Sequence, residues 1–247
     1  EINEAKRASW FSHKAEISKP HYYKVYLADY DVTTEIAPTE RGAQFQFTFP
    51  KTDNAHVLVD GFFKGSMVKV FPKERKIVGY CRNNSGGVPK NFHNYFVIYF
   101  DKDFEASQTW KINEKSKLNN SRLSKALTAK GYHAGAVVSF KTLNNEKITA
   151  KVASSFISLE QAELNLKREI GSDTFDQTKI KAEALWNTEL GRIEIQGGTV
   201  EQYQTFYTAL YRVLLFPRKF YELDAANEIV HYSPYNGEVL PGYMFTD

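Results

Sequence analysis

The sequence is poor in the residues that build disulfides and metal clusters. It contains one cysteine, Cys81, in 247 residues, which excludes an intrachain disulfide framework and a multi-cysteine zinc or iron–sulfur site. No stretch approaches the ~20 apolar residues of a membrane-spanning helix. The opening residues EINEAKRASW also lack the apolar core of a signal peptide. We therefore expect no membrane span, and either a cytosolic protein or one whose leader has been removed.

The sequence also lacks long segments of one charge sign, and it lacks common enzyme motifs. The 32 basic and 29 acidic residues are mixed along the chain, so no block of one sign could follow a phosphate backbone, and nucleic acid is excluded as a partner. The sequence has no glycine-rich phosphate loop, HExxH motif, EF-hand loop or GxSxG motif. Carboxylates are plentiful, but a glycosidase pair is defined by its separation in space, so sequence alone cannot identify one.

The residues that are present predict a β-rich first part. Apolar residues make up 42% of the chain and aromatic residues 15%, which is enough for a packed core and favours strands. Between His21 and Phe156 apolar residues alternate with polar ones. Phe45, Phe47 and Phe49, for example, share a face of one segment, a pattern typical of an antiparallel sheet with one solvated face. Eight such segments predict a two-sheet sandwich: YYKVYLADY, AQFQFTF, HVLVDGF, MVKVF, KIVGY, NYFVIYF, AVVSF and ITAKVASSF. We expect residues 111–133 to form a long surface loop.

The periodicity then changes to that of helices. Ser158, Thr174 and Thr199 each precede a glutamine by three residues, the arrangement of a capping box at a helix start. We expect the first helix to end at Gly171 and the second near Gly191, in both cases through the left-handed conformation of glycine. The third helix should carry a broad apolar stripe and stop before Pro217. The stripe consists of Val200, Tyr203, Phe206, Tyr207, Leu210, Val213 and Leu214.

The predicted fold class is therefore mainly β with α. An antiparallel β-sandwich over residues 1–157 is followed by three linker helices and a hairpin-like tail over residues 158–247. The tail turns at Asn236 and Gly237.

The segment CRNNSGGVPKNFHNYF, from Cys81 to Phe96, is the candidate binding loop. Its amides and Arg82 can donate to hydroxyl groups, and its aromatic residues can stack on a sugar ring. Arg82 and His93 are accordingly the candidate substrate-binding residues. A plain glycine-rich hairpin loop is the alternative interpretation.

Three stretches in one order resemble the N-terminal region of glycoside hydrolase family 92. They are WFSHKAEISKPHYYKVYLADYDVTTEIAPTERGAQFQFTFP from Trp10, TFYTALYRVLLFPRKF from Thr205 and YNGEVLPGYMFTD from Tyr235. In that family an N-terminal β-sandwich is joined by helices to a C-terminal (α/α)6 barrel.

The resemblance implies an exo-acting α-mannosidase that uses calcium, inverts the anomeric centre and acts on mannose-containing glycans such as N-glycans. The general acid, the general base and the calcium ligands of the family all come from the barrel, so no residue of this chain is matched to a catalytic or metal-binding role. The chain thus resembles an internal, non-catalytic fragment that ends at Asp247, where the barrel would begin, and its sandwich is expected to be incomplete at the N-terminus. The resemblance also implies an extracytoplasmic enzyme that is periplasmic, cell-surface or secreted.

Two further interpretations stay open from the sequence. In the first, the chain is a carbohydrate-binding or scaffolding module without catalysis. In the second, it is part of a phosphorylase or hydrolase from another family that combines a sandwich with a barrel, since architecture alone does not fix chemistry. If a barrel normally covers the third helix and the tail, the isolated chain should expose a contiguous apolar surface and associate with itself.

Overall fold

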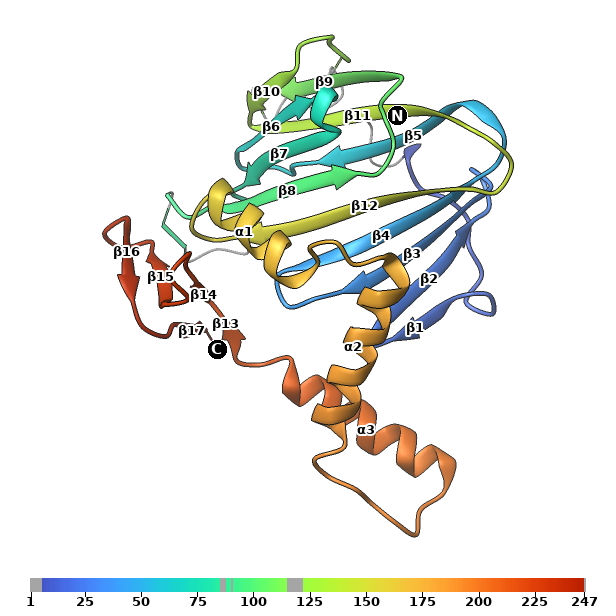
Figure 1. Ribbon diagram of the computed structural model, residues 1–247, viewed down its shortest axis with the longest axis vertical. Helices are drawn as coiled ribbons and strands as arrows, with labels where there is room; N and C mark the ends of the chain where they lie inside the picture. The colour runs from blue at the N-terminus through green and yellow to red at the C-terminus, as the bar shows by residue number, and fades with distance from the viewer. Residues whose placement is uncertain (1–5, 85–87, 90, 115–121, 247) are drawn as a thin grey trace.

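The first part of the chain folds into two antiparallel sheets that pack face to face (Figure 1). The computed structural model describes residues 6–84, 88–89, 91–114 and 122–246. The larger sheet has the strand order β1-β2-β3-β4-β12-β8-β7-β6-β10, and the smaller sheet has the order β5-β11-β9. The strands of the larger sheet are β1 (Ile17–Lys19), β2 (Tyr22–Leu27), β3 (Val32–Pro38), β4 (Gly42–Phe49), β6 (Ser66–Phe71), β7 (Lys76–Cys81), β8 (Asn94–Phe100), β10 (Thr128–Gly131) and β12 (Glu146–Ser155). Those of the smaller sheet are β5 (Thr52–Asp60), β9 (Ala106–Ile112) and β11 (His133–Thr142).

The main core lies between the sheets. Val68, Ile77 and Ile148 face inward from the larger sheet and Ala136 and Phe140 from the smaller one, all fully buried. Alternate residues of a strand point to the same face, so the two-residue period seen in the sequence is what gathers these side chains. Each large aliphatic side chain buried in this way stabilises the fold by about 1.5–3 kcal/mol. The predicted two-sheet sandwich is confirmed.

The opposite face of the larger sheet is covered by helices, so the predicted solvated face is wrong in part. Gln44 lies there on β4, fully buried, and its Nε2 donates to the Asp173 carbonyl at 3.0 Å and to Thr178 Oγ1 at 2.6 Å. Polar residues at alternate positions therefore mark a helix-covered face here. Alternation alone cannot distinguish such a face from one in water, because both accept polar side chains.

Three helices follow the sandwich, as predicted: α1 (Leu159–Glu169), α2 (Phe175–Leu190) and α3 (Val200–Leu214). Helices α2 and α3 begin with the complete capping boxes expected at Thr174 and Thr199. Helix α1 is capped by Ser158, but the Gln161 side chain does not complete the box because it bonds Asn165 and the Leu223 carbonyl instead.

The two predicted glycine ends differ. Gly171 follows α1 with the expected left-handed φ of 51°. Gly191 caps α2 with φ −72°, in the right-handed region, so the left-handed ending predicted for α2 is wrong.

The tail forms two small sheets. One pairs β13 (Arg218–Lys219) with β17 (Phe245–Thr246), and the other contains β14 (Tyr221–Leu223), β15 (Ile229–Ser233) and β16 (Glu238–Pro241). Strands β15 and β16 form the predicted hairpin, with Ser233 opposite Glu238. Gly237 supplies the left-handed φ of 76° that the turn requires.

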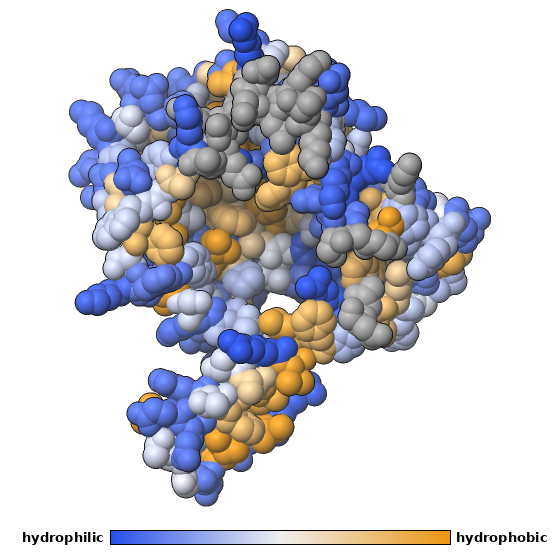
Figure 2. Space-filling model, turned by 180° about the vertical axis from the view of Figure 1, so that it is seen from behind, coloured by the Kyte–Doolittle hydropathy of each residue, from blue (hydrophilic) through white to orange (hydrophobic). Residues whose placement is uncertain are grey.

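Helix α3 projects from the rest of the molecule and packs against α2 (Figure 1). None of its described residues is buried. Val213 is 68% exposed and Phe216, just beyond the helix, is 52% exposed. Figure 2 shows the resulting apolar surface on the lower lobe of the molecule. No helix within the described residues is long and apolar enough to cross a membrane.

Four sandwich strands were not predicted from the sequence: β1, β3, β9 and β10. Part of the predicted loop over residues 111–133 is ordered as strand β10 and as a bridge between Thr109 and Ser124. Residues 115–121 of that loop lie outside the described residues. These strands are short or polar, and pairing with neighbours rather than apolar periodicity stabilises them.

Candidate functional site

The structure brings the two predicted binding residues, Arg82 and His93, to the same end of the sandwich. Arg82 directly follows β7, and His93 directly precedes β8. The Arg82 N–H donates to the Gly65 carbonyl at 3.0 Å. A Cβ atom added to Gly65 would lie 3.3 Å from Arg82 Cδ, so this side chain lies across the glycine. The two candidates therefore belong to one surface, although ten residues separate them.

Two tyrosines form the floor of this surface. Tyr80 on β7 pairs with Tyr95 on β8. The His93 ring meets Tyr80 edge-on with 4.7 Å between centroids, and it stacks at 5.5 Å on Tyr95. All three rings are half-buried, so their remaining surface faces solvent. We name Tyr80, Arg82, His93 and Tyr95 the aromatic platform.

The electrostatic surroundings keep His93 neutral near neutral pH. Burial lowers the pKa of His93, and the positive charges of Arg82 and Lys130 lower it further, against the opposing effect of a hydrogen bond to the Asn91 carbonyl. That bond joins His93 Nδ1 to the carbonyl oxygen at 2.6 Å. A carbonyl can only accept, so Nδ1 carries the proton and Nε2 is left as an acceptor.

This chemistry suits a neutral polyhydroxylated ligand. Arg82 offers donors, His93 Nε2 offers an acceptor, and the tyrosine rings offer apolar faces, which together match the hydroxyl groups and carbon faces of a sugar. The aromatic platform contains no carboxylate, whereas glycoside hydrolysis normally requires a pair of them. The platform thus offers groups that suit a sugar, but it lacks the pair of carboxylates that would cleave one.

A second polar site, which the sequence analysis missed, joins the tail to the sandwich. Glu222 on β14 is only 3% exposed. Its Oε1 accepts from Ser155 Oγ at 3.0 Å and from the Phe156 N–H at 2.8 Å, and its Oε2 accepts from Asn165 Nδ2 at 2.6 Å. All of these partners donate to the carboxylate oxygens. We name Ser155, Gln161, Asn165 and Glu222 the buried polar cluster.

One sequence signal for this cluster was available. Gln161 looked like the last member of a capping box, but its side chain turns to the cluster and donates to Asn165 Oδ1 at 3.0 Å and to the Leu223 carbonyl at 2.7 Å. Two arginines support the same docking through four long-range hydrogen bonds. Arg168 donates to the Leu223 and Asp224 carbonyls and Arg41 to those of Lys219 and Tyr221. No local pattern marks Glu222 as buried, because its partners come from distant parts of the chain.

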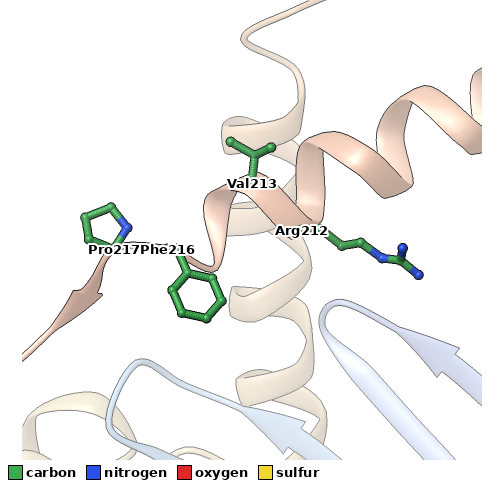
Figure 3. A pocket seen from close by; sticks show the side chains of 4 residues that line it. All are labelled: Arg212, Val213, Phe216 and Pro217. Atoms are coloured by element: carbon green, nitrogen blue, oxygen red, sulfur yellow. The ribbon is translucent and has the colours of Figure 1, made fainter. Parts of the chain in front are cut away.

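An open pocket of about 680 Å³ lies at the C-terminal end of α3 (Figure 3). Arg212 and Val213 line it from the last turn of the helix, and Phe216 and Pro217 from the turn that follows. Three of the four lining side chains are apolar, so this pocket is part of the exposed apolar surface of α3.

The described residues contain no cluster of the side chains that most often bind metal ions. Within the part of the chain that the structure describes, no three histidine, cysteine, aspartate or glutamate side chains are grouped so that they could hold one. No carboxylate cluster for the calcium that the family resemblance implies is therefore present among them.

Two family models match the chain in succession. The glycosyl hydrolase family 92 N-terminal domain matches residues 1–155, and the glycosyl hydrolase family 92 catalytic domain matches residues 161–247. The change from one match to the next falls where β12 gives way to α1. The predicted linker and tail are thus included in the catalytic-domain match.

Solved structures show the same relationship. A family 92 inverting mannosidase from Bacteroides thetaiotaomicron is 39% identical and superimposes with a TM-score of 0.90 over 98% of this chain and 32% of its own. A second family 92 α-mannosidase from that bacterium is 29% identical, with a TM-score of 0.81 over 96% of this chain and 32% of its own. The chain therefore spans about a third of the length of these structures.

Among curated proteins, an uncharacterized secreted glycosidase from Arthroderma benhamiae is 32% identical over 93 residues, which are 35% of this chain and 12% of that protein.

Proposed function

Because this chain belongs to glycoside hydrolase family 92, we propose that it forms the N-terminal part of an enzyme that removes terminal α-linked mannose from glycans with inversion. The observation that carries this proposal is the likeness to the inverting mannosidase, at 39% identity and a TM-score of 0.90 over nearly the whole chain. N-glycans are the proposed natural substrates. The likeness to a secreted glycosidase supports an extracytoplasmic location, which is periplasmic, cell-surface or secreted.

The proposed role of this chain is to bind and position substrate. Inversion requires one carboxylic acid and one carboxylate, roughly 6.5–9.5 Å apart with a water between them. We assign both groups, and the calcium site, to the part of the enzyme beyond this chain. Arg82 and His93 contribute sugar contacts at the edge of the active site, with Arg82 donating to a hydroxyl group and His93 Nε2 accepting from one.

The proposed intramolecular partner is the (α/α)6 barrel. Val213 and Phe216 expose apolar surface on and beside α3, and the tail adds Tyr235, 85% exposed, and Tyr243, 64% exposed. Exposed apolar surface of this extent normally marks an interface. The catalytic-domain match reaches the last residue of this chain, while the solved relatives are about three times as long, so the remainder of that domain is the fitting occupant.

The test is an assay of the full-length enzyme with an aryl α-mannoside and with α-linked mannobiose. Proton NMR at early times should show β-mannose as the first product, and a chelator should abolish turnover, with added calcium restoring it. The matched experiment replaces Arg82 by alanine, which should weaken binding of the disaccharide. Glycan binding by the full-length protein without any hydrolysis would favour the carbohydrate-binding module instead.

A further inference from the structure

The loop that carries His93 is packed against the tail, in the region matched by the catalytic-domain model. Phe92 stacks on Phe156, with 5.2 Å between ring centroids and 18° between planes, and lies 5.9 Å from Phe220 and 6.4 Å from Tyr232. Phe156 and Phe220 stack in turn at 4.5 Å. Packed aromatic pairs contribute specific geometry in addition to buried area, so these four rings hold the loop in one place relative to the tail.

The Asn91 carbonyl group links Tyr232 to the His93 ring. The Asn91 oxygen accepts from His93 Nδ1 at 2.6 Å and, more weakly, from the Tyr232 hydroxyl at 3.4 Å. The turn between β15 and β16 touches the same residue, because a Cβ atom on Gly237 would lie 3.4 Å from Asn91 Nδ2. The group that selects the His93 tautomer is therefore itself held by the tail.

The buried polar cluster fixes the other side of the same contact. Phe156, on which Phe92 stacks, donates its N–H to Glu222 Oε1. Glu222 is also bonded to Ser155 and Asn165, so the position of the Phe156 backbone is set by the docked β14 strand. A continuous series of contacts thus runs from Glu222 through Phe156 and Phe92 to the loop.

We propose that Phe92 and Tyr232 are positioning residues that hold the Asn91 carbonyl against His93. They thereby keep the His93 proton on Nδ1 and leave Nε2 as an acceptor toward the ligand. Sugar binding on the sandwich then depends on docking of the tail, a consequence that rests on the function proposed above. The geometry of the aromatic platform therefore depends on both parts of the chain: the sandwich loop that carries His93, and the segment of the catalytic-domain match that carries Tyr232.

The tautomer of His93 tests the positioning role of Phe92 and Tyr232 independently of any enzymatic activity. The 247-residue chain, labelled with nitrogen-15 at its six histidines, gives side-chain spectra in which His93 is assigned by loss of its signals in H93Q. The wild type should show the Nδ1–H tautomer, while F92L and Y232F should shift His93 toward Nε2–H. The matched control is Y99F, on the same strand β8. It removes a tyrosine hydrogen bond of similar length, from the Tyr99 hydroxyl to Glu163 at 3.3 Å, and should leave the His93 spectrum unchanged.

Kinetics in the full-length enzyme test the consequence for binding. With α-linked mannobiose, H93A should raise KM by about ten-fold, as expected for one lost polar contact, and F92L should raise it similarly with kcat little changed. The double variant F92L/H93A should be no worse than H93A alone, because both changes disable the same interaction. Additive losses in the double variant, or a wild-type tautomer in both F92L and Y232F, would overturn the positioning role. An unchanged KM in both R82A and H93A would instead refute substrate binding by the platform while leaving the tautomer result standing.

Discussion

Replacing Glu222 by alanine should release the tail from the sandwich. The carboxylate accepts three hydrogen bonds, from Ser155, Phe156 and Asn165, and is almost completely buried. Hydrogen bonds to a charged group contribute about 1.5–3 kcal/mol each, so the three sum to roughly 5–9 kcal/mol. Burial of the charge costs several kcal/mol, which the substitution removes, so we expect a net destabilisation of about 3 kcal/mol.

A conservative variant separates charge from shape. In E222Q an amide N–H group would face Asn165 Nδ2, and two donors cannot bond each other. If Asn165 rotates its amide to relieve the conflict, its Nδ2 leaves the Ser154 carbonyl and its Oδ1 leaves Gln161. E222Q should therefore cost about 2 kcal/mol, close to the penalty of one unsatisfied buried group. The matched control E228Q changes an exposed glutamate of the same tail and should stay within about 0.5 kcal/mol.

Thermal unfolding and hydrogen exchange together measure the effect. For a chain of this size 1 kcal/mol shifts the melting temperature by roughly 2–4 °C, so E222A should melt about 6–12 °C lower. If the tail undocks before the sandwich unfolds, the loss will instead appear as faster exchange of the Phe156 amide. An E222A protein with the melting temperature of the wild type and unchanged exchange at Phe156 would refute the docking role.

Burial raises the pKa of Glu169 despite hydrogen bonds from Thr39 and the Arg41 N–H, so its stabilisation is lost as pH rises through the folded pKa, and urea titrations should show E169Q gaining on the wild type as pH rises above about 4. The pKa of Asp60 is shifted in the opposite direction. Burial raises its pKa, but hydrogen bonds from His133 and other donors outweigh this and hold the pKa below its usual range, so the disadvantage of D60N should shrink as pH falls below about 4. The isolated chain should not hydrolyse an aryl α-mannoside with or without calcium, and turnover by the pure chain would place the catalytic groups here. In sedimentation the isolated chain should form oligomers that V213D shifts toward monomer, and a wild-type monomer at high concentration would contradict an unsatisfied apolar surface.

The features predicted well from sequence are those fixed by neighbouring residues. The three helix starts depend on a side chain and a backbone group three positions away, and all three were found at Ser158, Thr174 and Thr199. The β15–β16 turn depends on a left-handed residue at Gly237 and was found as well. The end of α2 at Gly191 was placed correctly although its conformation is right-handed, because a glycine can close a helix either way.

The features missed from sequence depend on contacts between distant segments. Strand β3 carries Thr33, Thr34 and Glu35 in its centre and forms only because β2 and β4 flank it on both sides. The buried Gln44 looked solvated because its partners lie about 130 residues further along the chain. Proximity of Arg82 to His93 could be inferred from the β7–β8 hairpin, but the part played by Tyr232 could not, since nothing local links residue 91 to residue 232.

The contacts between the two matched regions hold the tail in one orientation on the sandwich. Apolar packing alone would hold the tail with little preference for one orientation, because apolar attraction has no direction. Glu222 adds direction, since its oxygens accept from Ser155 on β12 and Asn165 on α1, and a rotated tail would leave a buried carboxylate unpaired. The stack of Phe156 and Phe220 lies beside this cluster, because the Phe156 N–H donates to Glu222. The aromatic platform therefore keeps one geometry relative to the tail, which belongs to the catalytic-domain match. A loop on the sandwich can help to position a sugar for catalytic groups located elsewhere only if that geometry is fixed.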